Sequence, residues 1–251
     1  MRWLLLSLLS IVFIACNKGS DRKFRLVKIR HEGFGFPTIF EYDAQGLLSL
    51  RYVDFKGTPD AGGGVQFKYE NSRLTEIVNS HVSYAGLTQT VDKIEYDGDG
   101  RLESMQEELI EGRPDFLTRR KFGYIGSDAY FDSCTEFRTR QGTETPYLLY
   151  TFTRDSVGNI LSQSTWSPDQ DNWVLNYKEE FSYGSVDNPE YKLGNPVSFL
   201  NYYSKKICTK VVRYNFEGTV LDQRGLKAIM LSPILIIVKE DNMDNIYYDL
   251  K

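Results

Sequence analysis

The chain is poor in the residues that build metal centres and nucleophilic sites. Its 251 residues include three cysteines and two histidines, His31 and His81. No two of these stand at the short spacing of a zinc-ligand pair such as C-x-x-C or H-x-x-x-H. A G-x-S-x-G nucleophile elbow is missing, and Gly33–Phe36 lacks the third glycine of a dinucleotide-binding loop. We therefore expect no metal, no cofactor and no catalytic residue.

The sequence also lacks a hydrophobic run long enough for a membrane-spanning helix. Its longest apolar stretch, Trp3–Ile14, falls short of the about 20 residues that a span requires. The stretch follows a positive start, Met1-Arg2, and ends at Ala15-Cys16 before the polar residues Asn17–Asp21. This arrangement is typical of an export signal that is removed from the mature protein.

The end of this signal, Phe13-Ile14-Ala15-Cys16, resembles the lipobox of bacterial lipoproteins, although Phe13 stands where leucine is commoner. The resemblance implies cleavage before Cys16 and a thioether-linked diacylglycerol on that residue. We therefore expect a signal peptide at 1–15, a lipidated tether at 16–23 and a mature domain at 24–251. It also implies a cell-envelope location, at the outer membrane facing the periplasm or the cell surface. The alternative is an ordinary secretory peptide with an unrelated cysteine.

Positive charge is scarce as well. Without Arg2, the remaining 29 basic and 34 acidic residues give the mature part a net charge of −5. An acidic balance argues against nucleic acid, which selects a basic surface. The two other cysteines, Cys134 and Cys208, either pair in the oxidising envelope or stay as free thiols, and spacing does not decide between these alternatives.

A repeated pattern, apolar-x-Tyr-Asp/Asn-x-x-Gly-x-apolar, runs along most of the chain. Phenylalanine and tyrosine alternate with polar residues before the turn, which predicts a strand with both rings on one face. Aspartate or asparagine bonds nearby backbone amides, and glycine accepts a positive φ, so the centre of the pattern predicts a turn. The tyrosine slots recur every 26 to 31 residues, at Tyr42, Tyr69, Tyr96, Tyr124, Arg154, Tyr183, Tyr214 and Glu240. The turn residues are Asp43 with Gly46, Asp97 with Gly100, Asp155 with Gly158, and Asn215 with Gly218.

The copy Tyr96–Leu102 resembles the YD repeat of RHS-type proteins, and the region 24–251 resembles a family of Gram-negative exported lipoproteins of unknown function with a porin-like fold. The resemblance implies an antiparallel meander and brings no catalytic residues. Together with the repeat it predicts an all-β chain of about seven or eight hairpins, curled or closed into a barrel-like sheet. A transmembrane barrel is the competing architecture, but charged strands such as Lys93–Tyr96 provide a lipid-facing apolar band only in patches.

Several polar and aromatic clusters are candidate sites. The acidic pairs, such as Glu107-Glu108, are explained by solvated strand positions, and the Asp97–Gly100 segment lacks a complete calcium loop. Trp166 and Trp173 flank a polar loop and are the candidates for stacking on a ligand. The expected function is a non-enzymatic binding or scaffold protein, tethered to the membrane, with a small-molecule, glycan or protein ligand. A hydrolase acting on glycans or peptides is the alternative.

Overall fold

The computed structural model of the chain is almost wholly β-structure. It describes residues 26–31, 36–54, 63–83, 86–112, 116–125, 130–193, 196, 198–231, 234–239 and 246–250. The predicted signal peptide (1–15), the tether (16–23) and Cys16 lie outside the described residues. No helix in the described ranges has the length and hydropathy to cross a membrane.

The described residues form sixteen strands and one short helix, α2. In chain order these are β1 (Leu26–His31), β2 (Thr38–Tyr42), β3 (Leu48–Val53), β4 (Gly64–Glu70), β5 (Arg73–Ser83), β6 (Gly86–Tyr96), β7 (Leu102–Glu111), β8 (Leu117–Gly123), β9 (Ser133–Arg140), β10 (Thr143–Arg154), β11 (Ile160–Asp169), β12 (Asn172–Asp187), α2 (Phe199–Tyr203), β13 (Lys206–Asn215), β14 (Val220–Leu231), β15 (Ile234–Lys239) and β16 (Ile246–Leu250).

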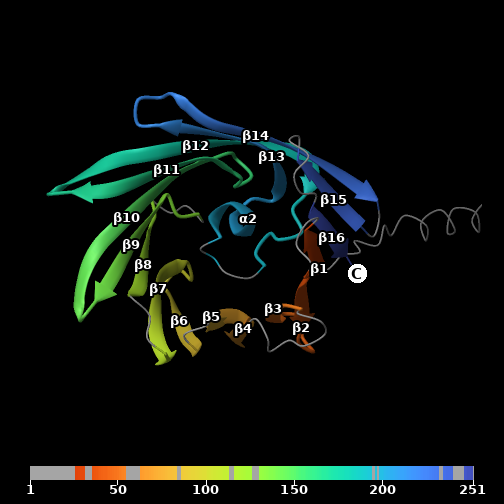
Figure 1. Cartoon of the computed structure of the whole chain (residues 1–251), viewed down its shortest axis with the longest axis horizontal. Helices are drawn as coiled ribbons and strands as arrows, with labels where there is room; N and C mark the ends of the chain where they lie inside the picture. The colour runs from red at the N-terminus through yellow and green to blue at the C-terminus, as the bar shows by residue number, and fades with distance from the viewer. Residues whose placement is uncertain are drawn as a thin grey trace, which may run out of the picture.

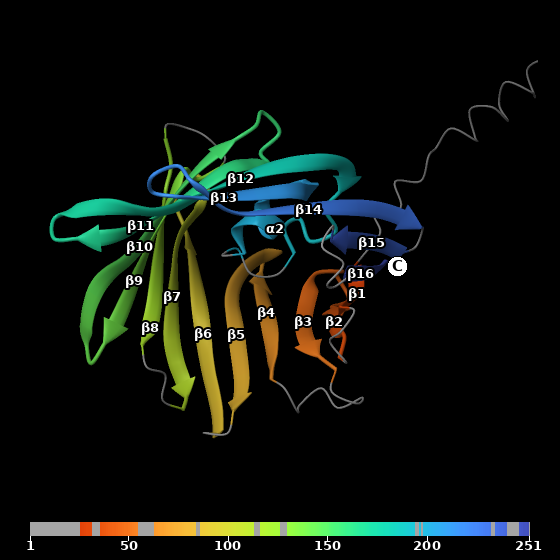
Figure 2. The ribbon, with the colours of Figure 1, turned by 45° about the horizontal axis from the view of Figure 1, so that its top comes forward.

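Every strand pairs antiparallel with the next strand in the chain, so the predicted all-β antiparallel meander in one sheet is confirmed. Strand β1 pairs with β16 as well as with β2, which makes the strand order that of a closed barrel. Figure 1 shows the strands around a ring with α2 inside it, and Figure 2 shows β2 to β10 standing side by side. Closure matters physically because it leaves no strand edge free to pair with another chain.

The meander places successive connections at alternate ends of the barrel. The connections after the even-numbered strands from β2 to β14 share one end, which we call the turn end; those after the odd-numbered strands lie at the opposite end. Since β1 runs toward the opposite end, the described chain enters the barrel at the turn end, at Leu26.

The four Asp or Asn turns have the same hydrogen bonds. In each, the glycine amide donates to the backbone oxygen of the Asp or Asn three residues earlier, at 2.9–3.1 Å. A side-chain oxygen of that Asp or Asn accepts from the amide four residues on, at 2.8 Å in all four turns. The glycines have φ between 78° and 95°, a region that disfavours residues with a Cβ. The pattern Asp/Asn-x-x-Gly therefore specifies a turn whose polar groups are bonded within the turn.

The regular register of the repeat is broken after Tyr183. Five repeat tyrosines pack against the core in the half of the barrel near the turn end: Tyr42 of β2, Tyr69 of β4, Tyr96 of β6, Tyr124 after β8 and Tyr183 of β12. Tyr214 instead ends β13, the strand next to β12, so its turn at Asn215 lies at the opposite end. Its hydroxyl donates to the exposed Glu180. Tyr214 pairs with Lys178 on the outer face, whereas the five core tyrosines face inward. The repeat therefore loses its register at the long β12–β13 connection, although the spacing of the tyrosines in the sequence stays nearly constant.

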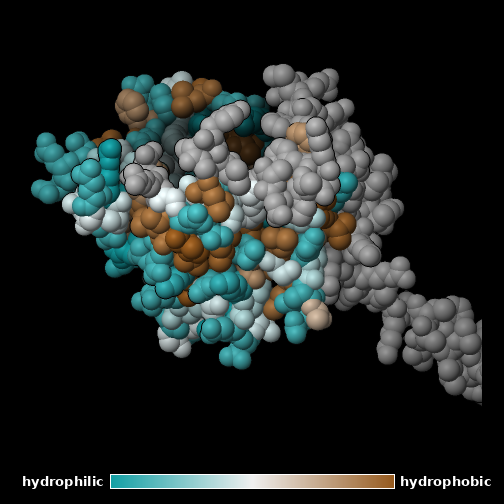
Figure 3. Space-filling view, turned by 60° about the horizontal axis from the view of Figure 1, so that its bottom comes forward, coloured by the Kyte–Doolittle hydropathy of each residue, from teal (hydrophilic) through white to brown (hydrophobic). Residues whose placement is uncertain are grey.

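Charged residues on neighbouring strands pair across the outer face of the barrel. Lys68 on β4 bonds Glu76 on β5 at 2.7 Å, and Lys93 on β6 bonds Glu108 on β7 at 2.7 Å. These residues alternate with the buried Phe67, Ile77 and Ile94 of the inner face. Figure 3 shows hydrophilic residues mixed with hydrophobic ones over one side of the molecule. The outer wall of these strands is therefore suited to contact with water.

Aromatic rings fill the inside of the barrel near the turn end. Phe131 is 1% exposed and lies 5.0 Å from the Phe122 ring and 5.3 Å from the Phe152 ring, between centroids. From inside the barrel, α2 adds Phe199 and Tyr203, whose ring centroids lie 5.8 and 4.7 Å from that of Phe131. The long β12–β13 connection thus folds inward and closes much of the lumen at this end.

Candidate functional site: a cavity in the barrel lumen

The repeat tyrosines hold neighbouring hairpins together with their hydroxyl groups. Tyr96 donates to the backbone oxygen of Leu74 at 2.8 Å, and Tyr124 donates to that of Leu102 at 2.9 Å. Tyr183 does the same to Ile160 at 2.5 Å, and the Ser204 hydroxyl lies 2.9 Å from it. Burial raises the pKa of Tyr124 to about 12. These hydroxyls stay protonated as donors, so the tyrosine face serves packing rather than proton transfer.

Beyond this aromatic core, the inner wall becomes polar. Asp92 is 5% exposed and accepts a hydrogen bond from the Asn79 amide at 2.9 Å. Burial is the main cause that raises the pKa of Asp92, with the Glu107 charge adding to it. Glu107 in turn accepts two bonds from Thr118, from its amide and its hydroxyl, both at 2.9 Å. A network of carboxylates and their donors therefore lines the middle of the lumen.

Arginine side chains complete this network. Glu136, 5% exposed, lies 2.9 Å from Arg120 Nη2 and 3.3 Å from Arg138 Nε. Across the barrel, Arg213 bonds Glu179 at 2.7 Å. Because an unpaired charge in a low-dielectric interior is costly, these pairs satisfy each other and stabilise the lumen wall.

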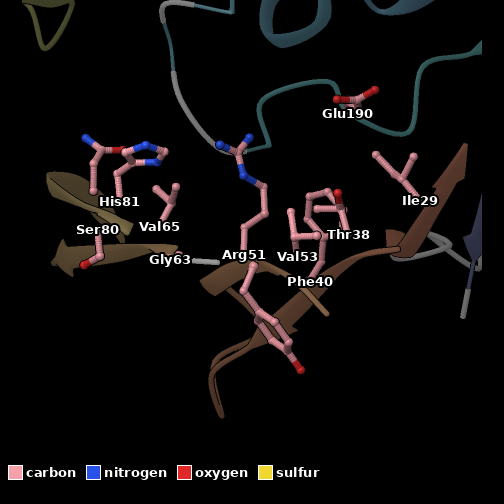
Figure 4. A pocket seen from close by; sticks show the side chains of 13 residues that line it. Ile29, Thr38, Phe40, Arg51, Val53, Gly63, Val65, Ser80, His81 and Glu190 are labelled. Carbon is pink, nitrogen blue, oxygen red and sulfur yellow. The ribbon is translucent and has the colours of Figure 1, made fainter. Parts of the chain in front are cut away.

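A cavity of about 430 Å³ lies in the lumen beside this network. Strands β1 to β5 form its floor, and Glu190 of the β12–β13 connection lies on its far side (Figure 4). Its lining residues are Ile29, Thr38, Phe40, Arg51, Tyr52, Val53, Gly63, Gly64, Val65, Asn79, Ser80, His81 and Glu190. A volume of this order suits a small organic ligand.

The β12–β13 connection that faces the cavity is fixed by buried hydrogen bonds. Ser204 is 1% exposed, and its hydroxyl accepts from the Ile160 amide at 3.3 Å. The Asn188 side-chain amide donates to the Ser204 backbone oxygen at 2.8 Å, and Asn188 Oδ1 accepts from the Glu190 amide at 2.9 Å. These bonds set the position of Glu190 relative to the strands.

A second, smaller cavity of about 210 Å³ lies between α2 and strands β11 to β14. Gln163, Phe181, Leu200 and Val211 line it together with two bonded pairs, Arg213 with Glu179 and Arg224 with Asp222. Its charges already have partners within the chain, so it is the weaker candidate for a ligand site.

The structure does not bring the predicted site residues into this cavity. Trp166 and Trp173 lie on β11 and β12, where Trp166 Nε1 donates to Thr151 Oγ1 at 3.1 Å. Trp166 alternates with the buried Thr165, which places the indole on the outer wall. The turn carboxylate of Asp97 accepts from the amides of Asp99 and Arg101 and from the Arg101 side chain. These residues have structural partners and do not form a common site.

The residues that do line the cavity were missed by reasoning from the sequence. His81, an exposed residue of β5, and Arg51 of β3 were not among the predicted site residues. The alternation of side chains along a strand could have indicated that they face inward. His81 follows Ile77 and Asn79 on the inner face of β5, and Arg51 pairs in register with the buried Phe40. The aromatic part of the lumen is occupied by Phe131 and Phe199, and none of the repeat tyrosines lines this cavity.

Cys134 and Cys208 are both free thiols. Cys134 is buried beside the core on β9, whereas Cys208 lies on β13 and is half-buried. Burial raises the pKa of the Cys134 thiol to about 12 and that of Cys208 to about 11. Both sulfurs are therefore protonated at neutral pH and poor nucleophiles.

No protein-family model matches the chain, and no curated protein sequence matches it. Among solved structures, it is similar to a porin-like protein from Bacteroides vulgatus ATCC 8482, with a TM-score of 0.55, 11% identity, and coverage of 90% of this chain and 98% of that one. A porin-like protein from Bacteroides uniformis ATCC 8492 gives a TM-score of 0.47, 11% identity, and coverage of 90% and 96%. At this identity the likeness concerns the fold alone, and the fold of this chain is porin-like.

Proposed function

We propose that this chain is a lipid-anchored cell-envelope protein that binds a small molecule in the lumen of its barrel and catalyses no reaction. The observation that carries the proposal is the cavity of about 430 Å³ beside Arg51, which has both an apolar wall and polar groups. Such a combination is the usual composition of a small-molecule site. A purely structural role does not require this volume inside a barrel that α2 already partly fills.

The charged residues of the outer wall support a barrel that is surrounded by water rather than one that spans the membrane. A transmembrane barrel needs an apolar outer band, and a charge on the lipid face costs about 2–4 kcal/mol at mid-membrane. The outer face instead carries cross-strand ion pairs, Lys68 with Glu76 and Lys93 with Glu108. The lipid on Cys16 then provides the attachment, and the barrel projects from the membrane.

The short segment between Cys16 and the barrel favours one orientation of the barrel relative to the membrane. Leu26 lies ten positions after Cys16, and an extended chain spans at most about 3.5 Å per residue. Leu26 lies at the turn end, whereas Val53, Gly63 and His81 place the cavity toward the opposite end. The tether therefore favours a barrel whose turn end faces the membrane and whose cavity lies on the side away from it.

The alternative function, that of a hydrolase, is less well supported by the residues of the lumen than ligand binding is. A glycosidase requires two carboxylates that face a substrate and are available for proton transfer or attack. Three lumen carboxylates are instead bonded to fixed donors: Asp92 to Asn79, Glu107 to Thr118, and Glu136 to two arginines. These bonds support a structural role for the acids, and we favour the binding function.

The anchor is tested by metabolic labelling with a fatty-acid probe. We expect the native chain to be labelled and processed, because its signal ends in the lipobox-like Phe13–Cys16. The variant Cys16→Ser should lose the label and accumulate unprocessed. Recovery of a processed, membrane-attached serine variant would show that the attachment does not depend on Cys16.

Ligand binding is tested with a fragment screen by ligand-observed NMR on the full chain in an uncharged detergent. Val65→Trp places a large ring in the cavity, since Val65 lines it. We expect fragments that bind the native chain to lose their signal with this variant. Leu161→Trp is the matched control, because Leu161 is 42% exposed and lies outside the lumen wall. Fragments that bind equally to all three proteins would place binding outside the cavity and contradict the proposal.

A further inference from the structure

We propose that the ligand of this cavity is a small organic anion, with a carboxylate or phosphate group held by Arg51 and an apolar body held by the neighbouring apolar side chains of the cavity floor. This inference rests on the proposed binding function and specifies its ligand class. Figure 4 shows the Arg51 guanidinium rising from β3 into the cavity, with the His81 imidazole at a similar level beside it.

Arg51 differs from the other arginines on the inner wall. Arg120, Arg138 and Arg213 each form an ion pair with a carboxylate, and Arg154 donates to the backbone oxygens of Gly158 and Phe131. Arg51 is half-buried, and within the described ranges it forms no hydrogen bond or ion pair. Burial lowers its pKa, and the charge of Glu190 partly offsets this effect. A half-buried guanidinium with five donors and no direct partner is suited to a planar anionic group.

The positions of the charged residues around Arg51 favour an anion on only one side of its guanidinium. Glu190 lies beyond Arg51 on the side of Thr38 and Ile29, whereas His81 and Val65 lie on the other side (Figure 4). A negative ligand is repelled by Glu190 and attracted by Arg51. The space between Arg51 and His81 is therefore the favourable position for the anionic group, where a ring nitrogen of His81 adds a donor.

The apolar part of the wall indicates the rest of the ligand. Ile29 and Phe40 are 8% and 7% exposed, and Val53 and Val65 add further apolar side chains to the cavity floor. These side chains have no polar atoms to offer a sugar or a bare inorganic ion. They favour an apolar or aromatic body attached to the anionic group, and a body of this kind gains affinity in proportion to the apolar area that it buries.

The test compares phenylacetate with phenylacetamide, which have the same shape and differ in charge. Isothermal titration calorimetry on the full chain in an uncharged detergent measures both probes, and phenyl phosphate distinguishes a phosphate site from a carboxylate site. We expect phenylacetate or phenyl phosphate to bind at least about tenfold more tightly than phenylacetamide, since a charge-assisted pair is stronger than a neutral one. Arg51→Gln should remove this preference, and Arg51→Lys should keep part of it.

Lys68→Gln is the control for net charge, because it removes one positive charge from the outer face of β4 and leaves the lumen unchanged. It should bind the anions as the native chain does. Equal affinity for phenylacetate and phenylacetamide, with both lost in Val65→Trp, would overturn the anion preference and leave the lumen site intact. Anion binding that persists in Val65→Trp would overturn both proposals. Circular dichroism spectra that match the native spectrum show that the variants are folded.

Discussion

Replacing Phe131 by alanine tests whether the inward β12–β13 connection is part of the folded core. Phe131 is 1% exposed and contacts rings from two sources, Phe122 and Phe152 of the barrel wall and Phe199 and Tyr203 of α2. Its loss leaves a void between the wall and the helix, and the rigid strands cannot collapse to fill it. A buried Phe→Ala change costs about 3–5 kcal/mol in the free energy of unfolding.

The expected shift is large enough to measure by thermal or urea denaturation. For a domain of this size, about 1 kcal/mol corresponds to about 2–4 °C in Tm. The Phe131→Ala variant should therefore melt about 6–20 °C below the native chain, followed by far-UV circular dichroism. Trypsin should also cut the 188–205 connection faster, because α2 loses its main aromatic contact. Phe216→Ala, at a residue that is 66% exposed, should change Tm by little.

A loss below about 1 kcal/mol, with unchanged cleavage of the connection, would refute the reasoning. It would show that α2 does not pack on Phe131 in solution, and that the lumen near the turn end is open. The cavity beside Arg51 would then lose its far side, because Glu190 belongs to the same connection.

Four further predictions follow from individual side chains. Tyr183→Phe should lower the free energy of unfolding by about 1–3 kcal/mol in urea titrations, because buried hydrogen-bonding groups lose their shared hydroxyl. Asp97→Ala should lower Tm at neutral pH, because the backbone amide of Arg101 bonds the Asp97 carboxylate and lowers its pKa. The Tm difference from the native chain should shrink as pH falls below about 4, since protonation removes the stabilising charge of Asp97. Asp92→Asn should raise Tm at neutral pH and lose this advantage near pH 4, since burial raises the Asp92 pKa and the charged form destabilises the fold; a lower Tm at both pH values would contradict this sign. In a thiol-labelling assay on the native chain, Cys208 should react slowly and Cys134 more slowly still, whereas both should label fully after unfolding.

The sequence by itself determined the local structure and the class of the fold. Alternation around Phe67 and Tyr69 specifies one face of a strand, and Asp97 with Gly100 specifies a turn, because each relies on neighbours a few residues away. Repeating such hairpins leaves few alternatives to an antiparallel meander. The position of the lipobox-like cysteine is also a property of the sequence alone.

Only the tertiary structure decided what fills the barrel and where its cavity lies. The break in register after Tyr183, the inward path of α2 and the meeting of Arg51, His81 and Glu190 all depend on the β12–β13 connection, whose sequence has no periodic pattern. These three residues are separated by 30 and 109 positions along the chain. Their proximity results from barrel curvature and from the burial of Phe199. Both depend on many contacts between residues far apart in the chain, so no short sequence pattern predicts them.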